Sequence, residues 1–534
     1  MVRQITCLMI AATVGLLPSA ARAQQHEHGA QPADRLGKVH FETSCSPSVK
    51  DAFDRAVALL HSFWFAASID AFTDVAKKDP GCAMAHWGVA LGVWGNPLGG
   101  TRTAQSMARG RAAVDQAKKV GAKTERERLY IAAVEALYAG EGDQFAHAAA
   151  YEKVMATIVA KYPKDTEAQV FHAIALDASA DPADKTYAKQ LQAAKALEKV
   201  MAAQPDHPGV THYLIHSYDY PPLADKGLPA ARRYAKIAPD APHALHMPSH
   251  IFTRVGAWQD SIDSNMASAA AAKKANSPAE ELHAMDYQAY AYLQMGKDTE
   301  AMRVQSDTEA ILARVEAGST YNMAAVYGAT AVPARVALER GAWKDAASLK
   351  QRSSGFAQAD ALTLFARALG AARSGQPAAA REALTALTPL PEALRGKNDT
   401  YWANIVAIQR KAAEGWTLHA EGKTAEGLAL LRQAADDEDA TEKSPVTPGP
   451  IAPARELLAE LLLDAKQPKD ALVEFEKAMT REPGRFRSIA GAMRAAQAAG
   501  DTAKAKKYAG NLLTLAKAAS PGRPEITEAQ KIGK

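Results

Sequence analysis

The sequence has little of what marks several large protein classes. It contains 3 Cys in 534 residues, and 7% of its residues are aromatic. Its net charge is only +4, the difference between 63 basic and 59 acidic side chains. Such a balance gives no basic surface for nucleic acid, and a mean hydropathy of −0.23 excludes an integral membrane protein. No phosphate loop, dinucleotide fingerprint, nucleophile–base triad motif or HExxH motif is present. We therefore expect no nucleic-acid partner and no integral membrane segment in the mature protein.

The first 23 residues have the pattern of an export signal. Arg3 precedes a short apolar run at residues 5–17, and Ala21-Arg22-Ala23 fits a small-residue cleavage site. The run is too short to cross a bilayer as a helix. We expect cleavage near Ala23 and a periplasmic or secreted protein.

Two cysteines, Cys45 and Cys82, follow the signal. An even pair in an oxidising compartment favours a disulfide. Each of the two residues precedes an expected helix, and these helices lie one repeat apart. Two unpaired thiols are the alternative.

The rest of the chain has the organisation of a helical repeat. A chain of this length requires several domains or a repeat array, and Ala-rich helical segments are interrupted by Gly and Pro at short intervals. Pro205 and Pro239, which each close an expected helix, are 34 residues apart. A Gly-x-aromatic-x-x-small pattern, complete or partial, recurs at the expected turns: Gly256 with Trp258 and Ser261, Gly296 with Ala301, Gly341 with Trp343 and Ala346, and Gly500 with Ala505.

This organisation resembles tetratricopeptide repeat proteins over nearly all of the mature chain. The string His243-Ala-Leu-His-Met-Pro-Ser-His-Ile-Phe-Thr-Arg-Val-Gly256 also resembles a group of exported bacterial tetratricopeptide proteins. The resemblance implies an all-α fold, a right-handed α-solenoid of helix pairs whose concave surface binds a protein or peptide partner. It implies no activity.

The expected domain order follows from these boundaries. It comprises a signal peptide at 1–23, a flexible tail at 24–44, a solenoid at 45–435 with a His-rich concave site at 205–296, a loop or hinge at 436–450, further helices at 451–520, and a tail at 521–534.

Histidine is distributed unevenly, because 14 of the 15 His fall between His26 and His283. When positions are counted from the closing Pro or the turn Gly, three consecutive repeat units place His and Asp on their inner helices. Spacings of three, four and seven residues put the members from one unit on one helix face. Adjacent helices lie roughly 8–10 Å apart, so these imidazoles can meet at one ion. The candidate metal ligands are His212, His216, Asp219, His243, His246, His250, His283 and Asp286.

His and Asp are ligands for divalent transition metals, so Zn, Cu, Fe, Mn or Ni is the expected cofactor. Arg254, Tyr290 and Arg335 lie on the same predicted surface as candidate ligand-binding residues. Two alternatives remain: an anionic ligand or peptide held by His and Arg254, and a structural polar network. Pro248, between His246 and His250, is either a tolerated irregularity or a kink that re-aims both imidazoles.

Three functions are compatible with this pattern. The first is an exported scaffold that binds a partner or ligand in its concave surface, with a metal ion at the cluster. The second is a metal-dependent hydrolase or oxidoreductase in which Asp219 or Asp286 acts as base. The third is metal storage or delivery.

Overall fold

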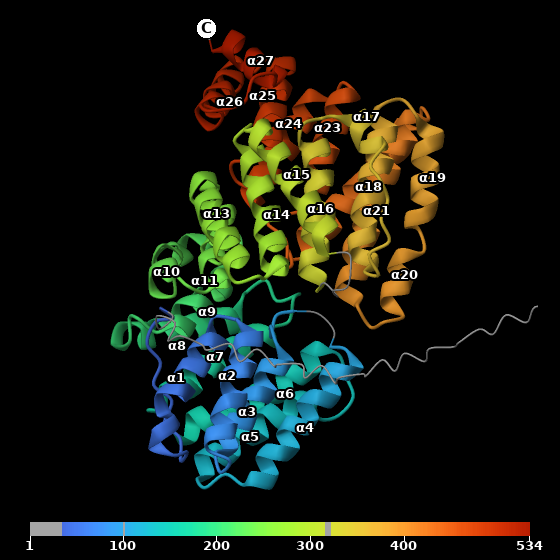
Figure 1. The fold of residues 1–534 in the computed structure, drawn as a ribbon. Coiled ribbons are helices and arrows are strands. Elements are labelled where there is room, and N and C mark those ends of the chain that lie inside the picture. The colour runs from blue at the N-terminus through green and yellow to red at the C-terminus, as the bar shows by residue number, and fades with distance from the viewer. Residues whose placement is uncertain (1–34, 100–101, 316–321, 534) are drawn as a thin grey trace, which may run out of the picture. The chain divides into compact units, whose positions relative to one another are not determined.

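The computed structural model describes residues 35–99, 102–315 and 322–533. The predicted signal peptide and residues 24–34 lie outside the described residues. Within those ranges every regular element is a helix, with no β-strand (Figure 1). None of the described helices is long and apolar enough to cross a membrane.

The helices run without interruption by other regular structure. The first part of the chain contains η1 (Pro47–Val49), α1 (Lys50–His61), α2 (Phe65–Lys78), α3 (Ala83–Trp94), α4 (Ala104–Val120), α5 (Glu125–Tyr138), α6 (Gln144–Lys161), α7 (Thr166–Ala178) and α8 (Ala188–Ala203). The middle part contains α9 (Pro208–Tyr218), α10 (Ala224–Ile237), α11 (Pro242–His246), α12 (Pro248–Arg254), α13 (Trp258–Lys274), α14 (Pro278–Gln294), α15 (Asp298–Val315), α16 (Met323–Glu339) and α17 (Trp343–Ala347). The last part contains α18 (Ala357–Arg373), α19 (Pro377–Leu387), α20 (Leu390–Arg395), α21 (Thr400–Ala420), α22 (Thr424–Ala440), α23 (Ala454–Asp464), α24 (Pro468–Arg481), α25 (Phe486–Ala498), α26 (Thr502–Leu515) and α27 (Pro524–Ile532).

Most helices pack against the helix that follows, so the described chain is an α-solenoid of tetratricopeptide-like helix pairs. The turn pattern has a direct structural basis. Gly256, between α12 and α13, has a φ of 71°, which favours a residue without a side chain. Five residues later Ser261 is fully buried between helices, as Ala346 is after Gly341. Small residues at these places allow the paired helices to approach closely.

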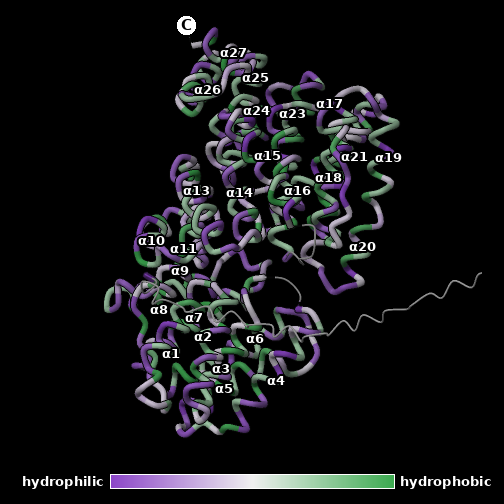
Figure 2. The backbone as a smooth tube through the Cα atoms, viewed as in Figure 1, coloured by the Kyte–Doolittle hydropathy of each residue, from purple (hydrophilic) through white to green (hydrophobic). Residues whose placement is uncertain are grey.

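The core lies between the helices and uses many small side chains. Apolar and polar residues are interleaved along the helices, as expected for helices that bury one face (Figure 2). Gly491 of α25 illustrates the close packing, because an added Cβ would lie 2.2 Å from the Phe475 ring of α24.

Two segments predicted as tails are packed where the structure describes them. Phe41 is buried with its ring centroid 5.0–5.6 Å from those of Phe53, Trp87 and Tyr130, so residues 35–44 belong to the first core. At the other end, residues 521–533 include helix α27. Arg523 anchors it through hydrogen bonds of 2.6 and 2.9 Å to Asp298.

The predicted loop or hinge at 436–450 also differs from expectation. Helix α22 continues to Ala440, and residues 441–453, which we call the crossing loop, lead to α23. The crossing loop is fixed by segments that are distant in the sequence. Glu442 accepts hydrogen bonds from Tyr187 and Lys185, both at 2.9 Å, and Tyr287 donates to the Pro445 carbonyl at 3.0 Å. These contacts hold the loop against the inner helices, which a hinge would not do.

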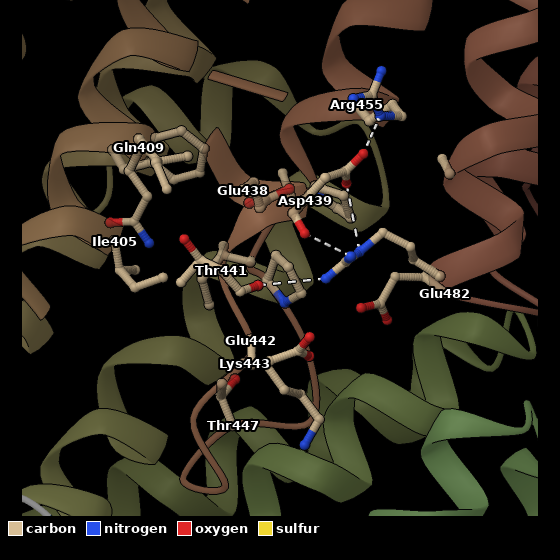
Figure 3. A pocket seen from close by; sticks show the side chains of 18 of the residues that line it. Ile405, Gln409, Glu438, Asp439, Thr441, Glu442, Lys443, Thr447, Arg455 and Glu482 are labelled. Carbon is tan, nitrogen blue, oxygen red and sulfur yellow. Dashed lines mark hydrogen bonds and ion pairs between the residues drawn. The ribbon is translucent and has the colours of Figure 1, made fainter. Parts of the chain in front are cut away.

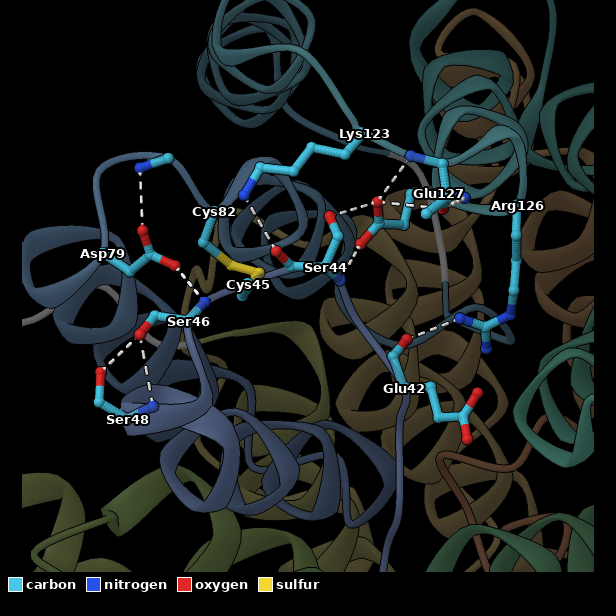
Figure 4. Close-up of a disulfide and its surroundings, with 12 residues drawn as sticks. Glu42, Ser44, Cys45, Ser46, Ser48, Asp79, Cys82, Lys123, Arg126 and Glu127 are labelled. Atoms are coloured by element: carbon cyan, nitrogen blue, oxygen red, sulfur yellow. Dashed lines mark hydrogen bonds between the residues drawn. A yellow bond between two sulfur atoms is a disulfide. The ribbon is translucent and has the colours of Figure 1, made fainter.

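A disulfide joins Cys45 to Cys82, with Cα atoms 4.7 Å apart (Figure 4). It ties the segment before α1 to the start of α3. The Ser46 backbone amide donates to Asp79 at 2.6 Å beside the bridge, and Ser44 binds Glu127 on its other side.

Candidate metal centre

Three consecutive inner segments carry the six histidines of the centre. Helix α9 begins at Pro208, and His207 caps it by accepting a hydrogen bond from the Val210 amide at 3.3 Å. Helices α11 and α12 meet at Met247, which keeps helical dihedrals of −53° and −36°. Pro248 has no amide hydrogen to donate, and the His250 amide bonds to Met247 at 3.1 Å, so the segment breaks between His246 and His250. Helix α14 supplies His283.

The six side chains form two groups. The first histidine set is His212, His216 and His243, and the second histidine set is His246, His250 and His283. In each set one nitrogen from each ring lies within 4.8 Å of the other two. Five of the six residues are buried and His243 is partly buried, so the predicted open trough is a closed interior at this point. The inner helices and the crossing loop cover it.

In the first histidine set, one ring is fixed by the backbone. The His212 Nδ1 donates to the His61 carbonyl at 2.6 Å, which leaves its Nε2 unprotonated. That Nε2 lies 3.1 Å from the Nε2 of His216. His216 Nδ1 and His243 Nε2 have no hydrogen-bond partner among the described residues. The set therefore brings lone pairs and unpartnered ring nitrogens together in a buried place.

In the second histidine set, two rings are fixed by side chains. The His246 Nδ1 donates to Asn265 Oδ1 at 2.7 Å, and the Asn265 amide nitrogen donates to the Ser261 carbonyl, which sets the orientation of the amide. The His250 Nδ1 donates to Asp219 Oδ2 at 3.0 Å. Both Nε2 atoms are therefore unprotonated in the neutral rings, yet they lie 3.1 Å apart. Two lone pairs face each other with no hydrogen between them.

Burial keeps five of these rings neutral. It lowers the pKa of His212, His216 and His246 well below the usual 6.5, and neighbouring histidines lower it further. Burial likewise lowers the pKa of His250 to about 4 and of His283 to about 3. Neutral imidazoles are the form that binds a metal ion.

An aromatic ring covers each set. Phe63, whose backbone has a φ of 53°, lies with its ring centroid 4.4–5.7 Å from those of the first histidine set. Tyr287 lies 4.6–5.6 Å from the rings of the second histidine set, and its hydroxyl is 3.4 Å from His250 Nε2. These rings exclude solvent from both sets.

Asp219, predicted as a ligand, lies behind an imidazole instead. Its Oδ1 accepts from Arg254 at 2.8 Å, and its Oδ2 accepts from His250 and from Lys443, each at 3.0 Å. Burial alone would raise the Asp219 pKa, but Lys443 and Arg254 hold it well below the usual value. Its carboxylate orients His250 and raises the basicity of that ring.

Asp286, the other predicted carboxylate ligand, is absent from both groups. It is fully buried and bound by Arg335, whose Nε and Nη2 donate at 2.6 and 3.3 Å. Arg335 also donates to backbone carbonyls of the crossing loop. The hydroxyl of Tyr290 accepts a hydrogen bond of 2.9 Å from Arg485. The three candidate ligand-binding residues, Arg254, Tyr290 and Arg335, thus all have partners within the protein.

A third buried histidine cluster provides a contrast. The Nε2 of His61 donates to Oε2 of Glu167, and the Nε2 of His207 donates to Oε1 of the same residue, both at 2.9 Å. The remaining ring nitrogen of His61 lies 3.0 Å from the Tyr213 hydroxyl, and that of His207 caps α9. Every ring nitrogen here has a protein partner, so this cluster needs no ion.

Sequence reasoning missed several residues around the centre. Tyr287 lies four residues after His283, a spacing that could have revealed it. Asn265 comes from the outer helix α13 and Lys443 from the crossing loop, and neither position carries a pattern that points to the histidines.

Comparison with known proteins adds little at the level of residues. No family model matches the chain, and no curated protein matches it. Among solved structures, the tetratricopeptide domain of P58(IPK) is similar at 11% identity, with 85% of this chain and 99% of that chain covered and a TM-score of 0.22.

Proposed function

We propose that this protein is an exported tetratricopeptide-like solenoid whose histidine centre binds transition-metal ions. The observation that carries the proposal is the 3.1 Å contact between His246 Nε2 and His250 Nε2, both of them unprotonated. If one ion bonded to both nitrogens at about 2.0–2.1 Å, the nitrogen–metal–nitrogen angle at this separation would be about 100°, close to a tetrahedral angle.

The two alternatives explain the site less well. An anionic ligand needs cationic partners, but five of the six imidazoles are kept neutral by burial and Arg254 is already bound to Asp219. A structural polar network satisfies its own nitrogens, as the His61–Glu167–His207 cluster does. The two histidine sets leave three ring nitrogens without partners.

The same contacts favour metal holding over carboxylate-assisted catalysis. Both oxygens of Asp219 and both of Asp286 accept hydrogen bonds from cationic or imidazole groups. Neither carboxylate is available as the general base that a metal-dependent hydrolase would require of it. Metal storage, metal delivery or electron transfer at the metal needs no general base.

Export and partner binding belong to the same proposal. The signal pattern at 1–23 and the disulfide between Cys45 and Cys82 both favour an oxidising compartment outside the cytoplasm. Solenoids of this class commonly present a surface to proteins. The crossing loop already covers the inner helices around the histidines, so we place a protein partner elsewhere on the solenoid.

Metal analysis of the full chain, purified without a metal-affinity tag, tests the proposal. We expect bound transition metal in the wild type, a lower content in His246→Gln, where the second histidine set loses a ligand, and wild-type content in His207→Asn. Asn at position 207 keeps a side chain that can cap the start of α9. A wild type that stays metal-free after addition of Zn²⁺ and Cu²⁺ would contradict the proposal, as would an unchanged content in His246→Gln.

A further inference from the structure

We propose that the centre is dinuclear and holds a pair of copper ions, one in each histidine set. This inference rests on the proposed function, since it specifies the number and identity of the ions. Its first basis is that the two sets are built alike. Each has two histidines four residues apart, whose Nε2 atoms are 3.1 Å apart, and one histidine from the next inner segment.

The repeat of the fold produces this duplication. Helix α9 and the α11–α12 segment open successive units of the solenoid, and each carries an i, i+4 histidine pair. The first pair is completed by His243 of α11, and the second by His283 of α14. The two three-imidazole sites are therefore successive copies of one arrangement, as the helix pairs that carry them are successive repeat units. Each site then has its own aromatic cover, Phe63 or Tyr287.

The two sites adjoin each other closely enough to act as one centre. Ring centroids across the boundary are 6.0 Å apart for His216 and His250, and 5.9 Å apart for His243 and His246. These separations resemble those within each set, such as 5.0 Å for His246 and His250. Two ions held in these sets would be neighbours with no side chain required between them.

The donor set favours copper. All six donors are imidazole nitrogens, which suit Zn, Cu, Fe and Ni, whereas Mg, Ca and Mn prefer carboxylate and carbonyl oxygen. Among the divalent ions copper binds such sites most tightly, and of these four metals copper is also the one with a common monovalent state.

The charge of the surroundings favours copper in its cuprous form. Asp219, the buried carboxylate behind His250, is already balanced by Arg254 and Lys443. The partly buried Glu280, 3.7 Å from His243 Nδ1, leaves one negative charge beside the six imidazoles. Buried, uncompensated charge is costly. A pair of monovalent ions adds half the positive charge of a divalent pair, so the cuprous state suits this interior best.

The test is a count of copper per chain. Metal-free full-length protein is titrated anaerobically with Cu(I) against a chelator that reports free Cu(I) by absorbance. We expect about two ions in the wild type and about one each in His243→Asn and His283→Asn. These two residues each have a ring nitrogen without a partner, so their replacement breaks few hydrogen bonds. His207→Asn is the matched control and keeps the wild-type count.

The outcomes separate this inference from the proposed function. One copper ion in the wild type overturns the dinuclear centre and leaves the metal-binding proposal standing, whereas no metal of any kind overturns both. Two zinc ions without copper binding overturn the assignment of copper. If either variant fails to fold, electron paramagnetic resonance of the oxidised wild type decides. A signal far below the copper content supports adjacent, coupled ions, and a full signal from every ion overturns the pair.

Discussion

Lys443 Nζ lies 3.0 Å from Asp219 Oδ2, although the two residues are 224 positions apart in the sequence. Both side chains are nearly buried. Figure 3 shows Lys443 extending from the crossing loop toward the helices of the middle part of the chain. Because Asp219 also accepts from His250, the contact links the crossing loop to the wall of the histidine centre.

Replacing Lys443 with Met should destabilise the fold. The change leaves the buried Asp219 with Arg254 and His250 but without its third partner, and hydrogen bonds to charged groups contribute about 1.5–3 kcal/mol. Urea unfolding should show a loss of this size.

A surface lysine provides the control for that variant. Lys477 pairs with Glu474 at 2.9 Å, but its side chain is 55% exposed. Lys477→Met should change the free energy of unfolding by less than about 0.5 kcal/mol. Equal losses in the two variants would contradict the structural role of the crossing loop.

Removing the disulfide should lower stability without changing the fold. Cys45 and Cys82 are 37 residues apart, and a loop of that length predicts a loss of about 3–4 kcal/mol on opening. The Cys45→Ser/Cys82→Ser variant should unfold at lower urea and keep its far-ultraviolet circular dichroism. Unchanged stability relative to the oxidised wild type would show that the bridge does not constrain the unfolded chain.

Glu438 predicts a particular dependence of stability on pH. Burial beside the polar pocket of Figure 3 raises its pKa from 4.5 to about 8. The folded protein therefore holds an extra proton between these values. This contribution to stability is full below about pH 4.5 and is lost as pH rises through about 8.

Glu438→Gln should remove that dependence, since Gln can still accept the Ala454 amide hydrogen bond and carries no charge. At pH 8.5 the variant should be more stable than the wild type by about 1–3 kcal/mol, and at pH 4.5 the two should be close. Unfolding curves at both pH values measure the difference. Glu392→Gln, at a side chain 75% exposed, should follow the wild type, and a Glu438→Gln variant that does the same would contradict the raised pKa of Glu438.

Metal removal should destabilise the middle helices. A ligand that binds only the folded state stabilises it by about 2.7 kcal/mol at one hundred times its dissociation constant. Chelation should lower the Tm of the wild type and should lower that of His246→Gln by less, because this variant keeps only the first histidine set intact. A wild-type Tm that does not respond to chelator or added metal would argue against ions in the centre.

Much of this arrangement could be predicted from sequence, because the inner positions of a helix-pair repeat recur at fixed spacing. That spacing placed His212, His216, His246 and His250 on adjacent inner segments, where the structure has them. The contacts of Asp219 and Asp286 could not be predicted, because Lys443 and Arg335 come from repeat units and loops far along the chain. The burial of the site likewise depends on the crossing loop, whose path no local pattern specifies.

The most direct measurement is anomalous X-ray scattering at the copper edge from crystals of the copper-loaded full chain. We expect two peaks, one among His212, His216 and His243 and one among His246, His250 and His283, each at bonding distance from imidazole nitrogen. No peak among these six residues, or a peak at His61, Glu167 and His207 instead, would contradict it.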